Sequence, residues 1–378
     1  MKLSNKITTL IFLIFIFGGF IINSIVPSKE FSEEENRVLQ QRPEFSFEDL
    51  ESGKYTADFD NYVMDQFVFR DFWVGIKSDL ESLRGMRENN DVFNAKDDYL
   101  LQAYKKVDSE LLDKNIESVN GLKESNSDIP VNLMVVPTAT EVLSEKLPYG
   151  APNYSQEYVL QYIRKKLNED INFVDSKSVL DEHRDEEIYY RTDHHWTSLG
   201  AYYGYNAASK SMGFKPYALD DFERRILSDK FYGTLYSKFN NKRVEPDKVE
   251  AFRLKNNLKH SLYYVDEDQR YDGLYREEFL EKKDKYSVFL GGNHSEVEIT
   301  TDIKDGNKSD KKLLVIKDSY GHSMVPFLAN HYEEIDMIDL RYYKKDINKY
   351  IDENHIDEVL VIYNADNFTT DNFIKRLS

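Results

Sequence analysis

Short apolar runs rich in β-branched residues alternate with helical patterns along this chain, and that alternation constrains its fold more than any other feature. Helical spacing is clearest over 111–122 and 158–167. Strands that alternate with helices favour a parallel sheet with helices on both faces. The sequence therefore predicts an α/β fold with a doubly wound, mostly parallel sheet. The predicted strands are 131–137, 171–174, 313–316, 335–338 and 359–363.

The segment from about 221 to 310 departs from this pattern. It is rich in tyrosine and charged residues, as residues 261–265 illustrate, and it predicts a β-rich insertion.

A length of 378 residues allows one large core or two moderate ones. We therefore predict a membrane segment over 1–27, a helical stalk over 28–95, and a main domain over 96–378 that contains the insertion.

The amino end predicts the compartment. Lys2 and Lys6 precede the almost wholly apolar stretch 7–26, and roughly 20 such residues span the hydrocarbon core of a bilayer. The positive charge before this stretch and the acidic run 33–35 after it orient the bulk of the chain outward. A cleaved signal peptide is the alternative, although 23–27 offers no A-x-A-like cleavage site. We favour an uncleaved single-pass anchor in the cell membrane with an extracytoplasmic main domain.

Beyond the anchor, residues 32–90 show helical, amphipathic spacing. The apolar stripe has two interpretations, because it can pack onto the main domain or bind a partner protein. Asn89-Asn90-Asp91 breaks the pattern and predicts the end of the stalk. The stripe comprises Phe59, Tyr62, Val63, Phe67, Trp73, Ile76, Leu80 and Leu83.

Composition excludes several classes of function. The net charge of −18 and the absence of a basic cluster argue against nucleic-acid binding, which normally requires a positive patch. The chain has no cysteine, which excludes disulfides, thiolate metal sites and a cysteine nucleophile. A nucleophile, if the chain has one, must come from another residue type.

Two segments far apart in the sequence carry groups for nucleophilic chemistry. Ser319 follows the apolar run 313–316, where a buried strand ends and a turn begins, while Asp193 and His195 stand one residue apart upstream. Serine becomes a good nucleophile when an imidazole takes its proton, and a carboxylate fixes the imidazole's tautomer. The carboxyl edge of a parallel sheet is where open α/β folds keep their sites. These residues predict a Ser-His-Asp acyl-transfer site, and the absence of a G-x-S-x-G motif argues against the common α/β-hydrolase elbow.

The residues around Asp193 allow a second role for it. Thr192 or Asp193 can cap a helix predicted over 198–212, which Gly213 ends. Asp193 is therefore either a helix cap or the carboxylate that orients His195. We expect His194 to be structural or to form a wall of the site, and the neighbouring tryptophan to pack beneath the loop.

A metal centre is a further interpretation of Asp-His-His, as in metal-dependent phosphohydrolases. Such two-metal sites need additional carboxylates on early strands. Here the motif follows the polar segment 189–192 and no D-x-D motif precedes it. We therefore expect no metal.

Five short segments form a specific combination, and they are Asn36-Arg37, Thr192–Thr197, Gly291–His294, Lys317–Tyr320 and Asp339–Tyr342. This combination resembles the bacterial DHHW proteins, which are similar to the SGNH-like O-acetyltransferases that modify alginate and cell-wall polysaccharides outside the membrane. The resemblance covers nearly the whole chain past residue 30. It implies the permuted motif order of the alginate acetyltransferase branch, in which Asp-x-His precedes the serine.

The resemblance also implies roles for individual residues. Ser319 would be the nucleophile, His195 the base and Asp193 the orienting acid. Gly292 and Asn293 resemble the glycine and asparagine that add oxyanion donors in SGNH enzymes, beside the Ser319 backbone N–H. A simple β-turn is the alternative interpretation of Gly292 and Asn293. Arg341 and Tyr342 are expected either to line an acceptor groove or, for Arg341, to form a surface ion pair.

The activity expected from this resemblance is transfer of acetyl groups to hydroxyls of a cell-surface polysaccharide through an acyl-serine. A carbohydrate O-acetylesterase of the same fold is the alternative, and a non-catalytic glycan-binding protein is the third class. The resemblance implies no cofactor. It does imply a partner, a multi-spanning membrane-bound acyltransferase that relays acetyl across the bilayer.

Overall fold

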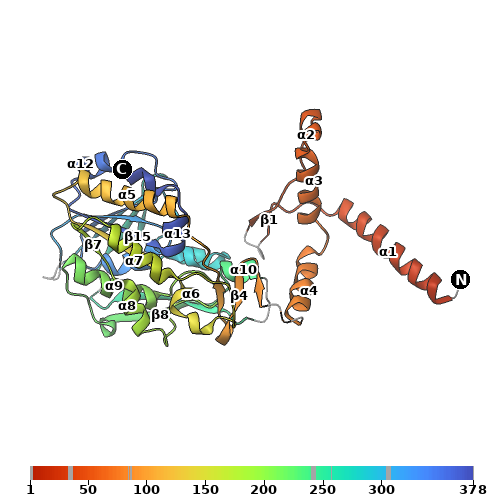
Figure 1. Ribbon diagram of the computed structural model, residues 1–378, viewed down its shortest axis with the longest axis horizontal. Helices are drawn as coiled ribbons and strands as arrows, with labels where there is room; N and C mark the ends of the chain where they lie inside the picture. The colour runs from red at the N-terminus through yellow and green to blue at the C-terminus, as the bar shows by residue number, and fades with distance from the viewer. Residues whose placement is uncertain are drawn as a thin grey trace. The chain divides into compact units, whose positions relative to one another are not determined.

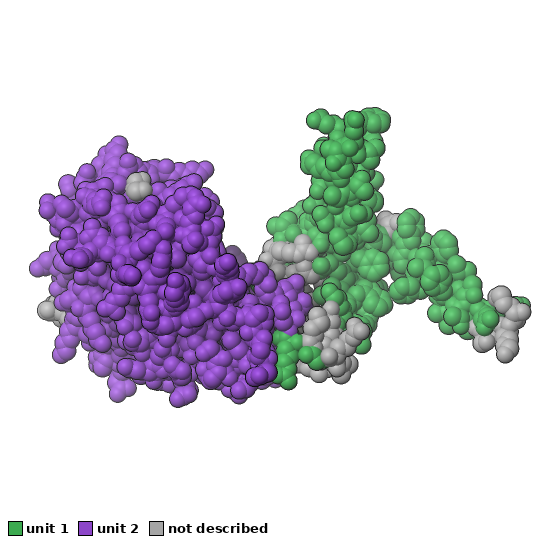
Figure 2. Space-filling view, viewed as in Figure 1, with its two compact units in different colours: residues 1–87, 237–243 green, residues 88–236, 244–378 purple. Residues whose placement is uncertain are grey.

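The computed structural model describes the chain except residues 1–2, 33–36, 84, 86, 240–243, 257, 304–307 and 378. Lys2, the acidic run 33–35 and Asn36 therefore lie outside the described residues. The chain divides into two compact units, 1–87 with 237–243, and 88–236 with 244–378 (Figure 2). The predicted domain limits at 27 and 95 stay predictions.

The second unit is a mixed α/β structure built on a mostly parallel sheet (Figure 1). The described strands of this sheet follow the order β11-β10-β12-β14-β13-β15-β6-β7, and the last five of these are mutually parallel. All five predicted strands are confirmed. They are β6 (Val131–Val136), β7 (Ile171–Phe173), β13 (Leu313–Lys317), β14 (Glu334–Ile338) and β15 (Glu358–Asn364).

The region predicted as an insertion contributes to two sheets. β8 (Phe222–Phe231) and β9 (Asp247–Leu254) pair with each other. β10 (His260–Tyr264), β11 (Gln269–Asp272) and β12 (Glu296–Thr301) instead extend the main sheet in antiparallel fashion. The described part of 221–310 is therefore strand-rich, as expected, but its second half is part of the sheet that carries the core.

Helices cover both faces of the main sheet, and alternate residues of the central strands β13 and β15 enter two apolar cores. In β13, Leu313 and Val315 enter one core, while Leu314 and Ile316 enter the other. Full burial of such a side chain stabilises the fold by roughly 1.5–3 kcal/mol relative to exposure. One face carries α5 (Ser109–Ser125), α7 (Gln156–Lys166), α12 (Ile347–Glu353) and α13 (Ala365–Thr370), and the other α6 (Ala139–Val142), α8 (Ser176–Glu182), α9 (Ser198–Met212) and α11 (Gly321–Leu328).

The helix predicted over 198–212 is present as α9, but its cap differs from the expectation. Thr197 is the N-cap, and its side chain accepts a hydrogen bond from the Gly200 backbone N–H. Gly213 ends the helix in the left-handed conformation, as expected from its sequence position. The prediction that Thr192 or Asp193 caps this helix was wrong, because the chain makes a further turn before the helix begins.

The second unit begins with a small three-stranded sheet, β3 (Glu88–Asn89), β4 (Val92–Asn94) and β5 (Leu100–Gln102). Asn90 and Asp91 join the first two strands, and both have positive φ angles, as a tight hairpin turn requires. The break in the helical pattern at Asn89-Asn90-Asp91 is therefore a hairpin. The described 3₁₀ turns of this unit are Lys96–Asp98, Ser144–Lys146, Leu219–Asp221, Glu277–Glu281, Lys285–Val288 and Ile374–Leu377.

The first unit contains the apolar helix α1 (Leu3–Ile25), in which Asn5–Asn23 is long and apolar enough to cross a membrane. The predicted stalk contains three helices among its described residues. The apolar stripe lies on the last two and on the turn between them, which holds Phe67. Its side chains from Phe59 to Leu80 are at least partly exposed wherever they are described. The elements are β1 (Phe31–Ser32), β2 (Arg37–Val38), α2 (Phe47–Glu51), α3 (Lys54–Asp65) and α4 (Arg70–Leu83).

Candidate active site

Ser319 stands at the carboxyl edge of the parallel sheet, between β13 and α11. The residue before it, Asp318, is buried, and its carboxylate accepts hydrogen bonds from the Tyr320 backbone N–H, from the Asn364 backbone N–H and amide, and from the Asn367 amide. Burial raises the pKa of Asp318, against the effect of these donors. The four contacts fix the turn that presents Ser319.

His195 joins the two segments predicted from the sequence. Its Nδ1 lies 2.5 Å from Asp193 Oδ1, and its Nε2 lies 2.7 Å from Ser319 Oγ. The Asp193 carboxylate also accepts a 3.0 Å hydrogen bond from the His195 backbone N–H. The fold therefore places a serine hydroxyl, an imidazole and a carboxylate in one hydrogen-bonded line.

The second oxygen of Asp193 is held by Thr234, at the start of α10 (Thr234–Phe239). Asp193 Oδ2 accepts hydrogen bonds from the Thr234 backbone N–H at 2.8 Å and from its hydroxyl at 3.1 Å. Burial opposes ionisation, but His194, His195 and these hydrogen bonds outweigh it, so the pKa of Asp193 lies below its ordinary value. Asp193 is thus an ionised, fully bonded carboxylate beside His195.

Gly233 allows this close approach. A Cβ at position 233 would lie 2.3 Å from both Asp193 Cβ and Oδ2. Only glycine fits there without displacement of the carboxylate.

Tyr286 supports His195 from one side. The two rings stack with centroids 3.8 Å apart and an interplanar angle of 9°. The Tyr286 hydroxyl lies 3.0 Å from the Ser319 carbonyl, to which it donates, and 3.0 Å from Ser323 Oγ. Tyr286 therefore contacts both the imidazole and the serine's main chain.

Trp196 and Tyr320 join the two segments a second time. The Trp196 indole N–H donates to the Tyr320 carbonyl at 3.1 Å, and the Tyr320 hydroxyl donates to the His194 carbonyl at 2.5 Å. Trp196 is fully buried, which agrees with the expectation that it packs beneath the loop. These two bonds tie residues 194–196 directly to the residue after Ser319.

His194 points to a different partner from His195. Its Nδ1 lies 2.6 Å from Thr234 Oγ1, and about a third of its side chain is exposed. His194 thus forms part of the wall around Asp193.

The loop before Asp193 is anchored by a second buried carboxylate. Asp247 accepts hydrogen bonds from the backbone N–H groups of Arg191 and Thr192 and from the Thr192 hydroxyl. Burial raises the pKa of Asp247 to about 6, because desolvation outweighs the three donors. Thr192 is therefore held by Asp247.

The Asp193, His194 and His195 ligand atoms lie within 4.8 Å of one another, which is close enough to consider a metal ion. Both ring nitrogens of His195 already face partners, Asp193 and Ser319. A metal bound through His195 would therefore have to replace one of these hydrogen bonds.

Gly292 and Asn293 lie in a tight turn, where Gly291 and Gly292 have positive φ angles. The Gly292 backbone N–H donates to the Phe289 carbonyl at 3.3 Å, as in a simple turn. The Asn293 side chain is exposed, and its Oδ1 accepts a 3.1 Å hydrogen bond from Arg341. The oxyanion role of both residues stays a prediction.

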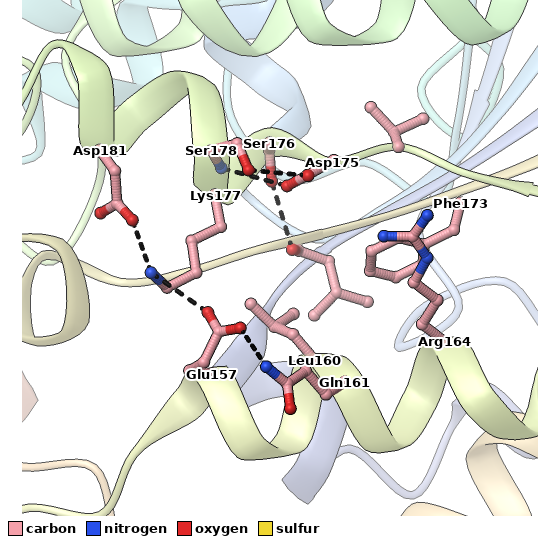
Figure 3. A pocket seen from close by; sticks show the side chains of 12 residues that line it. Glu157, Leu160, Gln161, Arg164, Phe173, Asp175, Ser176, Lys177, Ser178 and Asp181 are labelled. Atoms are coloured by element: carbon pink, nitrogen blue, oxygen red, sulfur yellow. Dashed lines mark hydrogen bonds and ion pairs between the residues drawn. The ribbon is translucent and has the colours of Figure 1, made fainter.

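A separate pocket of about 270 Å³ lies past the carboxyl ends of β6 and β7 (Figure 3). Lys177 lies between the carboxylates of Glu157 and Asp181 in its wall, at 3.2 and 2.6 Å. None of the predicted site residues is among those that line it.

Sequence reasoning missed several residues that support the site: Asp318, Gly233, Thr234, Asp247 and Tyr286. Asp318 stood beside the predicted nucleophile and could have been noticed from its position. The other four lie 38 to 91 residues after His195, and no local pattern marks them.

Comparison with known proteins gives the family. The family model described as DHHW protein matches residues 98–338, well over half of the chain. The chain belongs to the DHHW family. This DHHW match includes Asp193, His195, Ser319 and Asn293, and it ends just before Asp339. No curated protein matches the chain.

One solved structure agrees with that membership, and others have a similar fold. A DHHW family protein from Eubacterium siraeum is 28% identical with a TM-score of 0.66, over 76% of this chain and 95% of that one. Bacillus cereus PatB1 with a sulfonyl adduct is 24% identical with a TM-score of 0.64, over 75% and 97% of the two chains. A second structure of Bacillus cereus PatB1 is 25% identical with a TM-score of 0.61, over 73% and 97% of the two chains. The O-acetyltransferase domain of Pseudomonas putida AlgJ is more distant, at 14% identity and a TM-score of 0.49, over 76% and 98%.

Proposed function

We propose that this protein is an extracytoplasmic O-acetyltransferase that transfers acetyl groups to hydroxyls of a cell-surface polysaccharide. The observation that carries the proposal is the hydrogen-bonded line from Asp193 through His195 to Ser319. The DHHW membership supports it, because these proteins resemble SGNH-like polysaccharide O-acetyltransferases in motif content. The Asp-x-His segment precedes the serine, which fits the permuted branch of that superfamily.

In the first half-reaction, Ser319 Oγ attacks the carbonyl carbon of an acetyl donor while His195 Nε2 takes the hydroxyl proton. Asp193 holds Nδ1–H and stabilises the imidazolium that forms. Collapse of the tetrahedral intermediate breaks the bond to the donor's leaving oxygen, which receives the proton from His195. Ser319 is then left as an acetyl ester.

The tetrahedral intermediate needs donors for its negative oxygen. None of the described residues accepts a hydrogen bond from the Ser319 backbone N–H, so this donor is available. Removal of one oxyanion donor typically lowers kcat by roughly 10²- to 10³-fold. The Asn293 amide would supply a second donor.

In the second half-reaction, His195 takes a proton from a sugar hydroxyl, whose oxygen attacks the acetyl carbon. The Ser319–acetyl bond breaks, and the serine oxygen regains its proton from His195. Water in place of the sugar gives the esterase, which is the alternative function. Positioning a hydroxyl can outweigh bulk water, because effective molarities reach about 10⁵ M or more in well-oriented reactions.

The helix α1 would anchor the protein in the cell membrane with the second unit outside. An outward-facing site cannot draw directly on cytosolic acetyl donors. A multi-spanning membrane acyltransferase would therefore supply acetyl groups as partner.

Cells provide the test. Deletion of the gene should lower the O-acetyl content of one surface glycan, measured as acetate released by mild alkali. The parent gene should restore it, and the Ser319→Ala gene should not. A rise in O-acetyl content after deletion would replace the transferase by the esterase, and full restoration by Ser319→Ala would overturn both.

A further inference from the structure

A buried ionic cluster lies at the same sheet edge as Ser319, and the mechanism above does not use it. Lys317, Asp339 and His322 are nearly inaccessible, and Lys317 Nζ contacts Asp339 Oδ2 at 3.0 Å and His322 Nε2 at 2.7 Å. Burial lowers the pKa of Lys317 and the Asp339 carboxylate opposes this; with Lys317 Nζ as the donor, His322 Nε2 accepts. Burial, reinforced by Lys317, holds the pKa of His322 well below its ordinary value, so the ring is neutral.

Arg341 completes this cluster at its exposed side. Its Nε lies 2.9 Å from Asp339 Oδ1 and its Nη2 lies 2.6 Å from Asp339 Oδ2, a two-pronged pair that fixes the plane of the guanidinium. Burial favours neutral Asp339, but Lys317 and Arg341 outweigh it, so the pKa of Asp339 is lowered and the pair is ionic. The side chain of Arg341 is 31% exposed and therefore reaches the surface of the site.

A further contact of Arg341 determines how the Asn293 amide points. Nη2 also donates to Asn293 Oδ1 at 3.1 Å. A guanidinium only donates, so Asn293 must turn its oxygen toward Arg341 and its NH₂ group away. None of the described residues accepts a hydrogen bond from that NH₂ group.

The topology places this amide at the same edge of the sheet as the serine. Asn293 precedes β12, which pairs with β14, and the Asp339 backbone N–H donates to the Ser295 carbonyl. β14 in turn pairs with β13, whose end carries Ser319. The loop that ends at Asn293 begins near Tyr286, whose hydroxyl donates to the Ser319 carbonyl.

We propose that Arg341, fixed by Asp339 and Lys317, is a positioning residue that orients the Asn293 amide so that its NH₂ group donates to the oxyanion on acyl-Ser319. This inference rests on the proposed function and extends it to a residue beyond the match to the family model. Arg341 acts through Asn293 and does not touch the acetyl group. An amide free to rotate would present its oxygen to the oxyanion part of the time, and Arg341 removes that orientation.

A double-mutant cycle tests the coupling, because two residues that act as a unit are not additive. The full-length protein in detergent would be assayed with 4-nitrophenyl acetate as Asn293→Ala, Arg341→Gln and the double variant, with Lys345→Gln as an exposed cationic control. We expect Asn293→Ala to lower kcat about 10²-fold and Arg341→Gln about tenfold, with KM nearly unchanged. In the Asn293→Ala background, Arg341→Gln should add less than about a twofold loss.

Chemical rescue separates positioning from folding. Arg341→Ala should regain kcat when methylguanidinium chloride is added, while sodium chloride at the same ionic strength should have no effect, and melting temperatures identify any unfolded variant. Additive losses, an effect on KM alone, or the absence of rescue in a folded Arg341→Ala protein would overturn the inference. If Ser319→Ala hydrolyses the ester as fast as the parent, the proposed function fails instead, so the two failures are distinguishable.

Discussion

The two segments that form the site are held in place by different means. The serine segment follows a buried strand, and one carboxylate, Asp318, collects the hydrogen bonds that shape its turn. The histidine segment is an irregular loop with an isolated bridge between Tyr189 and Trp196. It accepts backbone hydrogen bonds from Leu100 and Tyr236, and its functional residues are held by side chains from other elements.

Those supports come from three places along the chain. Asp247 on β9 holds Thr192, Thr234 on α10 holds Asp193, and Tyr286 stacks on His195. Tyr286 and Trp196 each add one hydrogen bond to the turn that Asp318 shapes, whereas the irregular loop has a separate support for nearly every functional residue. In the serine segment, the substitution that lowers activity most should be that of Ser319 itself. For the histidine segment, substitutions of distant residues that hold the loop should also lower activity.

The largest effect should come from the nucleophile. Ser319→Ala should lower hydrolysis of 4-nitrophenyl acetate on the order of 10⁴-fold or more with an unchanged melting temperature, because triad members act as a unit. Ser323→Ala is the matched control, because among the described site residues the buried Ser323 hydroxyl hydrogen-bonds to Tyr286 alone, and this variant should lose far less activity. Equal rates for Ser319→Ala and the parent would show that another residue is the nucleophile.

The next effect tests the histidine segment itself. His195→Ala should approach the loss seen for Ser319→Ala, because its ring lies between Asp193 and Ser319. His194→Ala should lose only about tenfold, because its ring contacts Thr234 instead. A larger loss in kcat at His194 than at His195 would reverse the assignment of the base.

A support residue far from the motif should give an intermediate effect. Gly233→Ala puts a Cβ 2.3 Å from Asp193 Oδ2, so the carboxylate must shift. Displacement of a catalytic group by about 1 Å can cost on the order of 10²-fold in kcat. Thr234→Val, which keeps the backbone N–H but removes the hydroxyl, should cost about tenfold or less. Wild-type kcat in Gly233→Ala would contradict the tight packing at Asp193.

The smallest effect concerns stability and pH. The pKa of Asp247 is raised to about 6 in the folded protein, above its ordinary value of 3.8. Its contribution is therefore fully present below about pH 4 and is lost as pH rises through about 6. Thermal unfolding should show the advantage of the parent over Asp247→Asn shrinking between pH 4 and 6. A difference that grows with pH would contradict this assignment.

The same contrast explains what the sequence could predict. The strand before Ser319 and the two strands that pair with it are apolar runs. Their positions, and the place of the serine at the sheet edge, were therefore predictable from the local pattern. Asp193 and His195 were predictable as candidates. The contact of His195 with Ser319 spans 124 residues, and it was expected only from the motif pattern and the family resemblance.

The supports of the loop were not predictable in the same way. Thr234, at the start of a helix, and Asp247, at the start of a strand, have no distinguishing local pattern. They lie beside the loop because they follow and begin the paired strands β8 and β9. The cap of α9 was misassigned for a related reason, since Thr192 and Thr197 are both good caps and tertiary contacts to Asp247 decide between them.

The central claim is that His195 activates Ser319 as a nucleophile, and covalent labelling tests it most directly. Phenylmethanesulfonyl fluoride would be added to the full-length protein and to His195→Ala, and the labelled residue would be located by peptide mass spectrometry. We predict one sulfonyl group on Ser319 in the parent and almost none in His195→Ala over the same time. Equal labelling of Ser319 in both proteins, or labelling of a different residue in the parent, would contradict the account.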